Sequence, residues 1–158
     1  MNVRYCWQLL LLCALGCCAL PAARAADMAP QQILGRWLTE PRNGVIEIGT
    51  APDGSLRGTI IGGDSPNRLD TKNPEATKRS ERLLGQLIVK QMKYDGSGHW
   101  SGGTIYDPDS GRTYSCRFEL LEADRLKVRG FIGLSLLGRT QIWTRFTGSS
   151  LVLPPASH

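Results

Sequence analysis

Apolar and polar residues alternate with a period of two through most of the chain that follows residue 33. This alternation predicts strands over residues 34–39, 45–50, 56–63, 84–93, 99–107, 112–121, 125–131 and 139–146. Short segments rich in Gly, Asp, Asn and Pro separate most of these strands. Because connections of hairpin length join antiparallel strands, we expect each strand to pair with the next one along the chain.

One connection, residues 64–83, is much longer than the others. Asn73 is a suitable helix cap, Pro74 suits the first helical position, and Gly85 would follow the end, so the segment predicts a short helix from about Pro74 to Arg82. Loops of this length serve as lids or mouths of binding sites, and equally as plain solvated crossovers. Pro30 similarly favours a single helical turn before the first strand.

A sheet of eight antiparallel strands has two edge strands whose unpaired backbone groups must be protected. Closure into an up-and-down barrel removes the edges, so the pattern favours an all-β, eight-stranded antiparallel barrel with one short helix in the loop between strands 3 and 4. The interior of such a barrel either fills with side chains or holds one small ligand. A sandwich of two sheets is the structural alternative, because it has the same strand spacing.

The first 25 residues have the pattern of a cleaved signal peptide. Arg4 precedes an apolar run, and Ala23-Arg24-Ala25 supplies the small residues of a cleavage site. We therefore expect an exported protein, periplasmic or secreted, with a barrel domain over residues 26–146 and a flexible tail over residues 147–158. Acylation at Cys17 or Cys18 is a weaker alternative, since Ala14-Leu15-Gly16 has Ala and Leu in the wrong order for a lipobox.

Cleavage would change both the charge and the cysteine content. It would remove two arginines and no acids, which lowers the formal net charge from +5 to +3. The remaining positive charges are scattered, so nucleic-acid binding is not expected. Only Cys116 would remain, which excludes an intramolecular disulfide, and no later stretch is apolar enough to suggest a transmembrane segment in the mature chain.

Two sets of motifs resemble known families. Gly35-x-Trp37 in the first strand, together with Arg145 in the last, resembles the lipocalin and wider calycin signature. The longer succession resembles the bacterial domain-of-unknown-function 2147 family, through Asp70-x-x-Asn73-Pro74, Trp100-Ser-Gly102-Gly103-x-Ile105-Tyr106-Asp107-Pro108, Gly111-x-x-Tyr114, Leu126-x-Val128-Arg129-Gly130 and Gly138-Arg139-Thr140-Gln141-x-Trp143-Thr144-Arg145. This resemblance implies an exported protein with a lipocalin-like fold and no established activity. The lipocalin resemblance implies that Trp37 plugs one end of the barrel beneath Arg145.

Alternation assigns some strand faces and leaves others open. Tyr114, Cys116, Phe118 and Leu120 share an apolar face that should point inward. Arg129 is outward unless a bulge intervenes. In the last strand one face carries Arg139, Gln141, Trp143 and Arg145, and alternation alone does not say whether this face is inside.

The polar residues of this region supply the main candidate for a ligand site. An arginine buried on the inner face needs a partner, which could be an internal carboxylate such as Glu47 or Asp107, or the anionic head of a ligand. Aromatic residues would then form the walls of the pocket. The candidate ligand-binding residues are Arg139, Gln141, Trp143, Arg129, Trp100, Tyr106, Tyr114, Asp70 and Asn73, with Phe118 as a further wall residue.

Catalytic and metal-binding residues are few. Asp70 and Asp107 could form an acid–base pair, but aspartates in such positions more often cap their own turns. Cys116 lies on an apolar face, and His99 is the only histidine outside the tail, so neither a nucleophile nor a zinc site is expected, and no cofactor is implied.

These observations leave three hypotheses for function. The first is a binding protein for a small, partly apolar ligand that could be anionic. The second is a hydrolase or isomerase that uses Asp70 and Asp107, supported by Arg129. The third is a protein-binding module of the cell envelope that acts through residues 64–83. The sequence does not specify the ligand or the oligomeric state.

Overall fold

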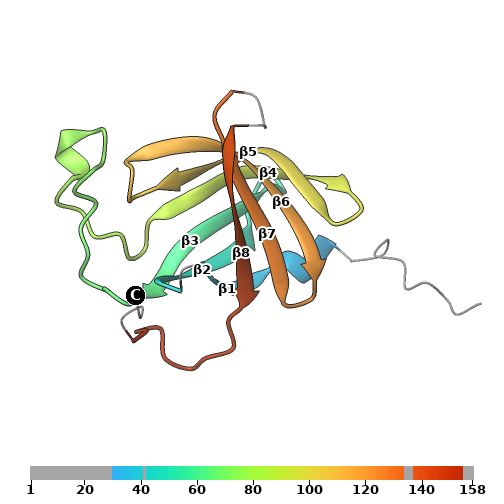
Figure 1. Cartoon of the computed structure of the whole chain (residues 1–158), viewed down its shortest axis with the longest axis horizontal. Helices are drawn as coiled ribbons and strands as arrows, with labels where there is room; N and C mark the ends of the chain where they lie inside the picture. The colour runs from blue at the N-terminus through green and yellow to red at the C-terminus, as the bar shows by residue number, and fades with distance from the viewer. Residues whose placement is uncertain (1–29, 41, 134–136, 155–158) are drawn as a thin grey trace, which may run out of the picture.

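The structure, a computed structural model, describes residues 30–40, 42–133 and 137–154. Its eight strands form one closed antiparallel barrel in chain order, with β8 paired back to β1 (Figure 1). The strands are β1 (Gly35–Leu38), β2 (Gly44–Thr50), β3 (Leu56–Gly63), β4 (Leu87–Gly96), β5 (His99–Asp107), β6 (Arg112–Glu122), β7 (Arg125–Phe131) and β8 (Gly138–Arg145). The predicted barrel is therefore confirmed, and the pairing of β1 with β8 excludes the sandwich.

The predicted helix over residues 74–82 is reduced to a 3₁₀ turn, Ala76–Lys78. Asn73 does not cap this turn as predicted, because the N-cap is Glu75, without a side-chain cap hydrogen bond, and the Asn73 Oδ1 instead accepts a 2.9 Å hydrogen bond from the Glu75 N–H in an Asx turn. The segment fails to continue as an α-helix because residues 74–77 are all exposed, so no apolar face packs against the barrel to stabilise further turns. The expected turn before β1 is present as the 3₁₀ turn Pro30–Ile33.

The inward faces of the strands divide the barrel into a packed end and a hollow end. The apolar face predicted for β6 is confirmed, since Cys116, Phe118 and Leu120 are buried and the intervening Ser115 and Arg117 are exposed. These side chains belong to a core cluster that also contains Trp37, Trp100, Leu126 and Trp143. Apolar burial of this kind is the main stabilising contribution in a domain without a disulfide.

Trp37 and Arg145 close the packed end together. The Trp37 ring is fully buried, and its Nε1–H donates a 2.8 Å hydrogen bond to the Ile33 carbonyl. The Arg145 guanidinium carbon lies 3.9 Å from the centroid of this ring. Arg145 also donates to the carbonyls of Leu34 and Ala123, so it joins the segment before β1 to the β6–β7 turn. Cation–π contact and hydrogen bonds thus hold the plug that the resemblance implied.

The sequence predicts a signal peptide at the start of the chain and a flexible tail at its end. The predicted signal peptide lies outside the described residues and stays a prediction. Residues 147–154, expected as the start of a flexible tail, are attached to the end of β3, because Gly63 donates to the Leu151 carbonyl and accepts from the Leu153 N–H. Within the described part of the chain, no helix is both long and apolar enough to span a membrane.

Candidate functional site

The barrel contains a cavity of about 830 Å³ that reaches its hollow end. The deeper walls are apolar side chains that alternate inward along several strands. They include Ile46, Ile60, Ile88, Ile105, Val128 and Trp143. The rim is polar and is formed by the start of β8, the β5–β6 turn and the first part of the loop between β3 and β4. A volume between about 300 and 1,000 Å³ with apolar walls and a few polar groups is typical of a small-molecule site.

The face of β8 that the sequence left open points inward. Trp143 is 2% exposed and lines the cavity together with Gln141 and Arg139, the residues that share its face. Gln141 Oε1 accepts a 2.8 Å hydrogen bond from the Trp143 Nε1–H, so this pair is satisfied internally. Arg139 lies at the exposed rim, and its side chain forms no hydrogen bond or ion pair with any residue that the structure describes. An arginine without a partner beside an apolar cavity is a candidate anchor for a ligand.

The internal partners considered for these arginines are engaged elsewhere. Glu47 lies on the outer surface, where its Oε1 is 3.7 Å from Arg36 Nε. Asp107 caps its own turn, accepting hydrogen bonds from the Asp109 N–H at 2.9 Å and the Ser110 hydroxyl at 2.8 Å. The structure therefore does not pair either carboxylate with Arg139.

Several of the predicted ligand-binding residues lie outside the cavity. Arg129 is on the outer face of β7, where its Nη1 donates a 2.8 Å hydrogen bond to Thr140 Oγ1, because no bulge reverses the alternation between Val128 and Gly130. Trp100 is buried in the core, with Tyr94 5.1 Å away between ring centroids. Phe118 is also buried in the core cluster rather than exposed to the cavity. Tyr106 and Tyr114 line the cavity.

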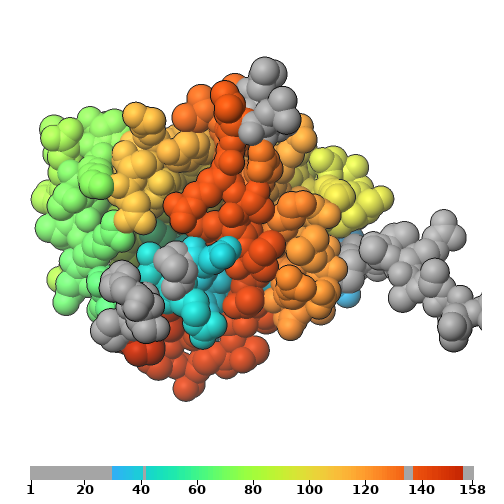
Figure 2. Space-filling view, in the orientation of Figure 1, coloured from blue at the N-terminus to red at the C-terminus, as the bar shows by residue number. Residues whose placement is uncertain are grey.

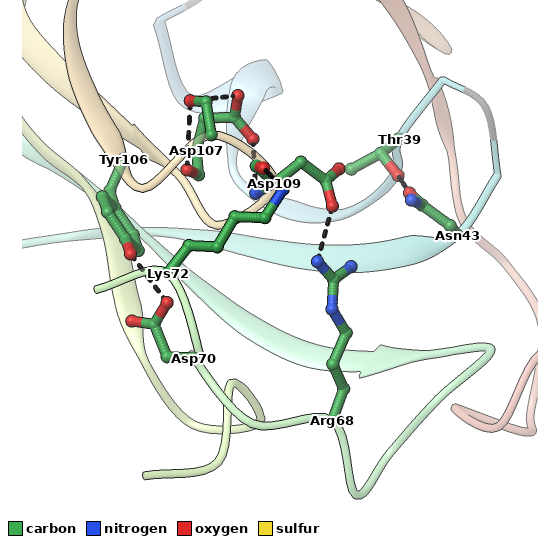
Figure 3. A network of polar contacts seen from close by, with 9 residues as sticks. Thr39, Asn43, Arg68, Asp70, Lys72, Tyr106, Asp107 and Asp109 are labelled. Atoms are coloured by element: carbon green, nitrogen blue, oxygen red, sulfur yellow. Dashed lines mark hydrogen bonds and ion pairs between the residues drawn. The ribbon is translucent and has the colours of Figure 1, made fainter. Parts of the chain in front are cut away.

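Asp70 and Asn73 do not line the cavity and instead hold the long loop in place, and Figure 3 shows Asp70 beside Tyr106. Asp70 is 1% exposed, and its Oδ1 accepts a 2.7 Å hydrogen bond from the Tyr106 hydroxyl. Its Oδ2 accepts a 2.6 Å hydrogen bond from Asn73 Nδ2. Burial and the hydrogen bond to Asp70 raise the pKa of the Tyr106 hydroxyl, so it remains a protonated donor. The Asp-x-x-Asn motif thus joins the loop to β5.

A second set of contacts joins the same loop to the β5–β6 turn (Figure 3). Arg68 forms an ion pair with the Asp109 carboxylate, and Lys72 Nζ donates a 2.6 Å hydrogen bond to the Asp109 carbonyl. Gly111 has a φ of +68°, and a Cβ there would lie 2.0 Å from the Lys72 carbonyl oxygen. The absence of a side chain at Gly111 is therefore what lets the loop approach the turn.

This arrangement gives no support to acid–base catalysis by Asp70 and Asp107. Asp70 is buried and fully engaged with Tyr106 and Asn73, whereas Asp107 accepts hydrogen bonds within its own turn. Arg129, assigned the supporting role, lies on the outer face. The convergence of side chains that the hydrolase hypothesis requires is not found among these residues.

The Cys116 thiol and the side chains that can bind metal ions are the remaining candidates for chemistry. Burial raises the pKa of the Cys116 thiol to about 12, so the thiolate is not populated near neutral pH. Among the described residues, no group of at least three His, Cys, Asp or Glu side chains is placed to hold a metal ion.

The loop over residues 64–83 offers little apolar surface for a protein partner. Leu69 is its only large apolar side chain with substantial exposure, at 40%, since Leu83 is buried. The apolar patch that would favour the protein-binding hypothesis is absent from this described segment.

Replacing Asp70 with Ala should destabilise the protein by about 1–3 kcal/mol, the usual cost of leaving buried donors without an acceptor. The Tyr106 hydroxyl and the Asn73 amide both lose their acceptor in this variant. Urea denaturation followed by circular dichroism measures the change. Asp109→Ala is the matched control, because its exposed ion pair should contribute less than about 1 kcal/mol. Equal losses in the two variants would contradict the anchoring role of Asp70.

Sequence reasoning missed most of the apolar cavity wall. Ile46, Ile60 and Val128 alternate inward, and the period-two pattern could have named them once the inward face was known. Glu40 and Arg68 also line the rim, but they come from connections with no periodic pattern. Their placement depends on how the β1–β2 and β3–β4 connections fold over the end of the barrel.

Comparison with known proteins agrees with the fold. A family model described as an uncharacterized protein conserved in bacteria, DUF2147, matches residues 35–145. Among solved structures, protein HP1028 from the human pathogen Helicobacter pylori, which belongs to the lipocalin family, superposes with a TM-score of 0.65 at 19% identity, over 72% of this chain and 82% of that one. No curated protein sequence matches significantly. The matched residues run from the first strand to the last and include the whole cavity-bearing barrel, and the chain therefore belongs to the bacterial DUF2147 family, with a lipocalin-like fold.

Proposed function

We propose that this protein is an exported binding protein that holds a small amphipathic molecule in its barrel, with the apolar part inside and the polar head at the rim. The cavity of about 830 Å³ with its isoleucine, valine and tryptophan walls carries the proposal. Burying an apolar chain against these walls would contribute about 25 cal/mol for each Å² removed from water. The N-terminal signal pattern supports a periplasmic or secreted location.

The charges at the rim limit the head group. Four acids border the cavity, namely Glu40, Asp64, Asp107 and Asp109, against the two arginines Arg68 and Arg139. This excess of negative charge disfavours a multiply charged anion. Arg68 is already paired with Asp109, which leaves Arg139 as the cation available to a ligand within the described rim. We therefore propose a single carboxylate, bound beside Arg139, as the head group.

Three ligands with one chain and different heads test the proposal: laurate, dodecanol and dodecylamine. Competition with a fluorescent probe such as N-phenyl-1-naphthylamine measures their affinities. All three should bind, and laurate should bind about fivefold more tightly than dodecanol, the size of effect expected from one partly exposed charge pair. Arg139→Gln should abolish this preference and leave dodecanol binding unchanged.

Arg57→Gln provides the matched control, because it removes the same charge from an exposed position that does not line the cavity. The control should retain the preference for laurate. Tighter binding of dodecylamine would contradict the proposed head group. Failure of all three ligands and of the probe to bind would contradict the binding function itself.

A further inference from the structure

Apolar side chains are exposed at the end of β7 and just before the start of β8. Ile132 is 54% exposed and Leu137 is 75% exposed, the latter the most exposed large apolar residue among those described. Both border the mouth of the cavity, together with Phe131. Figure 1 shows the end of β7 and the start of β8 at the top of the barrel, away from the long loop at the left, and Figure 2 shows the same end of the barrel in surface view. We call Phe131, Ile132 and Leu137 the hairpin tip.

Positive charge lies directly behind the hairpin tip. Arg117 and Arg129 are cross-strand partners on the outer face of β6 and β7. Arg117 also lies over the Phe131 ring, with 5.6 Å between its guanidinium carbon and the ring centroid. Two arginines opposite each other concentrate positive charge on this part of the outer face. The next cross-strand pair carries Glu119, which is neutralised by Lys127 at 2.8 Å.

The acids of the rim do not share this outer face. Asp107 and Asp109 belong to the β5–β6 turn, beside the long loop that Arg68 and Lys72 attach to it. Glu40 accepts a hydrogen bond from the Ile142 N–H at 2.7 Å, on the β1 side of the barrel. An apolar tip backed by arginines is therefore complementary to a surface that is apolar inside and negatively charged outside.

We propose that the hairpin tip docks on a lipid bilayer that contains anionic lipids. Ile132 and Leu137 insert at the boundary between head groups and acyl chains, and Arg117 and Arg129 contact lipid phosphates. The spacing fits, because Arg129 is three strand residues from Ile132, roughly 10 Å, and interfacial segments bury their apolar side chains about 5–10 Å deep. Docking rests on this surface alone. Docking would let an amphipathic ligand pass directly between the bilayer and the cavity, and this role of docking rests on the function proposed above.

Co-sedimentation with vesicles tests the docking. The protein should bind vesicles of phosphatidylcholine mixed with phosphatidylglycerol more tightly than vesicles of phosphatidylcholine alone, and added salt should weaken the binding. The double variant Ile132→Ser/Leu137→Ser should bind the mixed vesicles about tenfold more weakly or worse, since it loses two apolar side chains. Arg117→Gln and Arg129→Gln should each weaken binding about fivefold, on the mixed vesicles only.

Val152→Ser is the control, because Val152 is 60% exposed but lies beside the end of β3. It should bind vesicles as the unaltered protein does, and thermal unfolding should show that the tip variant remains folded. The arginine variants should still bind laurate from solution, because neither residue lines the cavity, which separates failure of docking from failure of ligand binding. Absence of vesicle binding, equal binding by the tip variant and the control, or a concentration-dependent dimer that the tip variant abolishes would overturn the proposal.

Discussion

Gly130→Trp should abolish binding of laurate and of the fluorescent probe while the barrel remains folded. Gly130 faces the cavity from β7, and an added Cβ would meet only Tyr114 and Ile105, at the ordinary contact distances of 3.5 and 3.6 Å. An indole ring built from this position would occupy the space between the apolar walls. We expect affinity to fall by at least about tenfold, which corresponds to 1.4 kcal/mol. Probe titration measures the loss.

Gly49→Trp is the matched control for the cavity variant. Gly49 lies on β2, it does not line the cavity, and a Cβ there would have no heavy atom within 4 Å. The same increase in side-chain volume should therefore leave the affinity unchanged. Full binding by the Gly130 variant, with the protein shown to be folded by circular dichroism, would place the ligand outside the barrel and contradict the proposed function.

Trp37→Ala should be the most destabilising single substitution considered for this protein. The ring is completely buried in the core cluster, donates to the Ile33 carbonyl and supports the Arg145 guanidinium. Truncation of a buried tryptophan to alanine costs about 3–5 kcal/mol, through lost apolar contact and the cavity that remains. Since single domains are stable by only about 5–15 kcal/mol, much of the molecule's stability would be lost. Urea denaturation measures the change in free energy of unfolding.

The adjacent Arg36→Ala variant is the control for the plug. Arg36 is exposed, and its ion pair with Glu47 spans 3.7 Å at the surface, so its removal should cost less than about 1 kcal/mol. Arg145→Lys is informative in the same assay, because lysine retains the charge but cannot reproduce the planar guanidinium that reaches both Leu34 and Ala123. A loss below about 1 kcal/mol for Trp37→Ala would show that the packed end does not depend on this plug.

The sequence specified the strands well because their signal is local. Alternation in β6 placed Cys116 and Phe118 inside, and the same reasoning correctly kept Arg129 outside unless a bulge intervened. The helix prediction over residues 74–82 failed, and so did the predicted cap at Asn73. A helix this short needs an apolar face to bury, and residues 74–77 are all exposed.

The sequence predicted the site residues less well, because a residue's place in a motif does not specify which way its side chain points. Asp70 and Asn73 stood in a motif and were grouped with ligand-binding residues, yet in the fold they serve Tyr106 and the long loop. Trp100 was grouped with them as a wall residue and lies in the core. Gln141 and Trp143 share a face in any strand, but only closure of the barrel turns this face toward the cavity.

By itself, the sequence determined the number and order of the strands, their antiparallel pairing and the resemblance that implied a plug of Trp37 and Arg145. These follow from the period of two and from turn residues, which act over a few neighbours in the chain. Only the tertiary structure decided that the last strand turns Gln141 inward, that Arg139 stands at the rim without a partner among the described residues, and that the interior remains hollow. The physical reason is that cavity volume and charge pairing depend on which side chains from distant strands meet. A local sequence pattern holds no information on these long-range contacts.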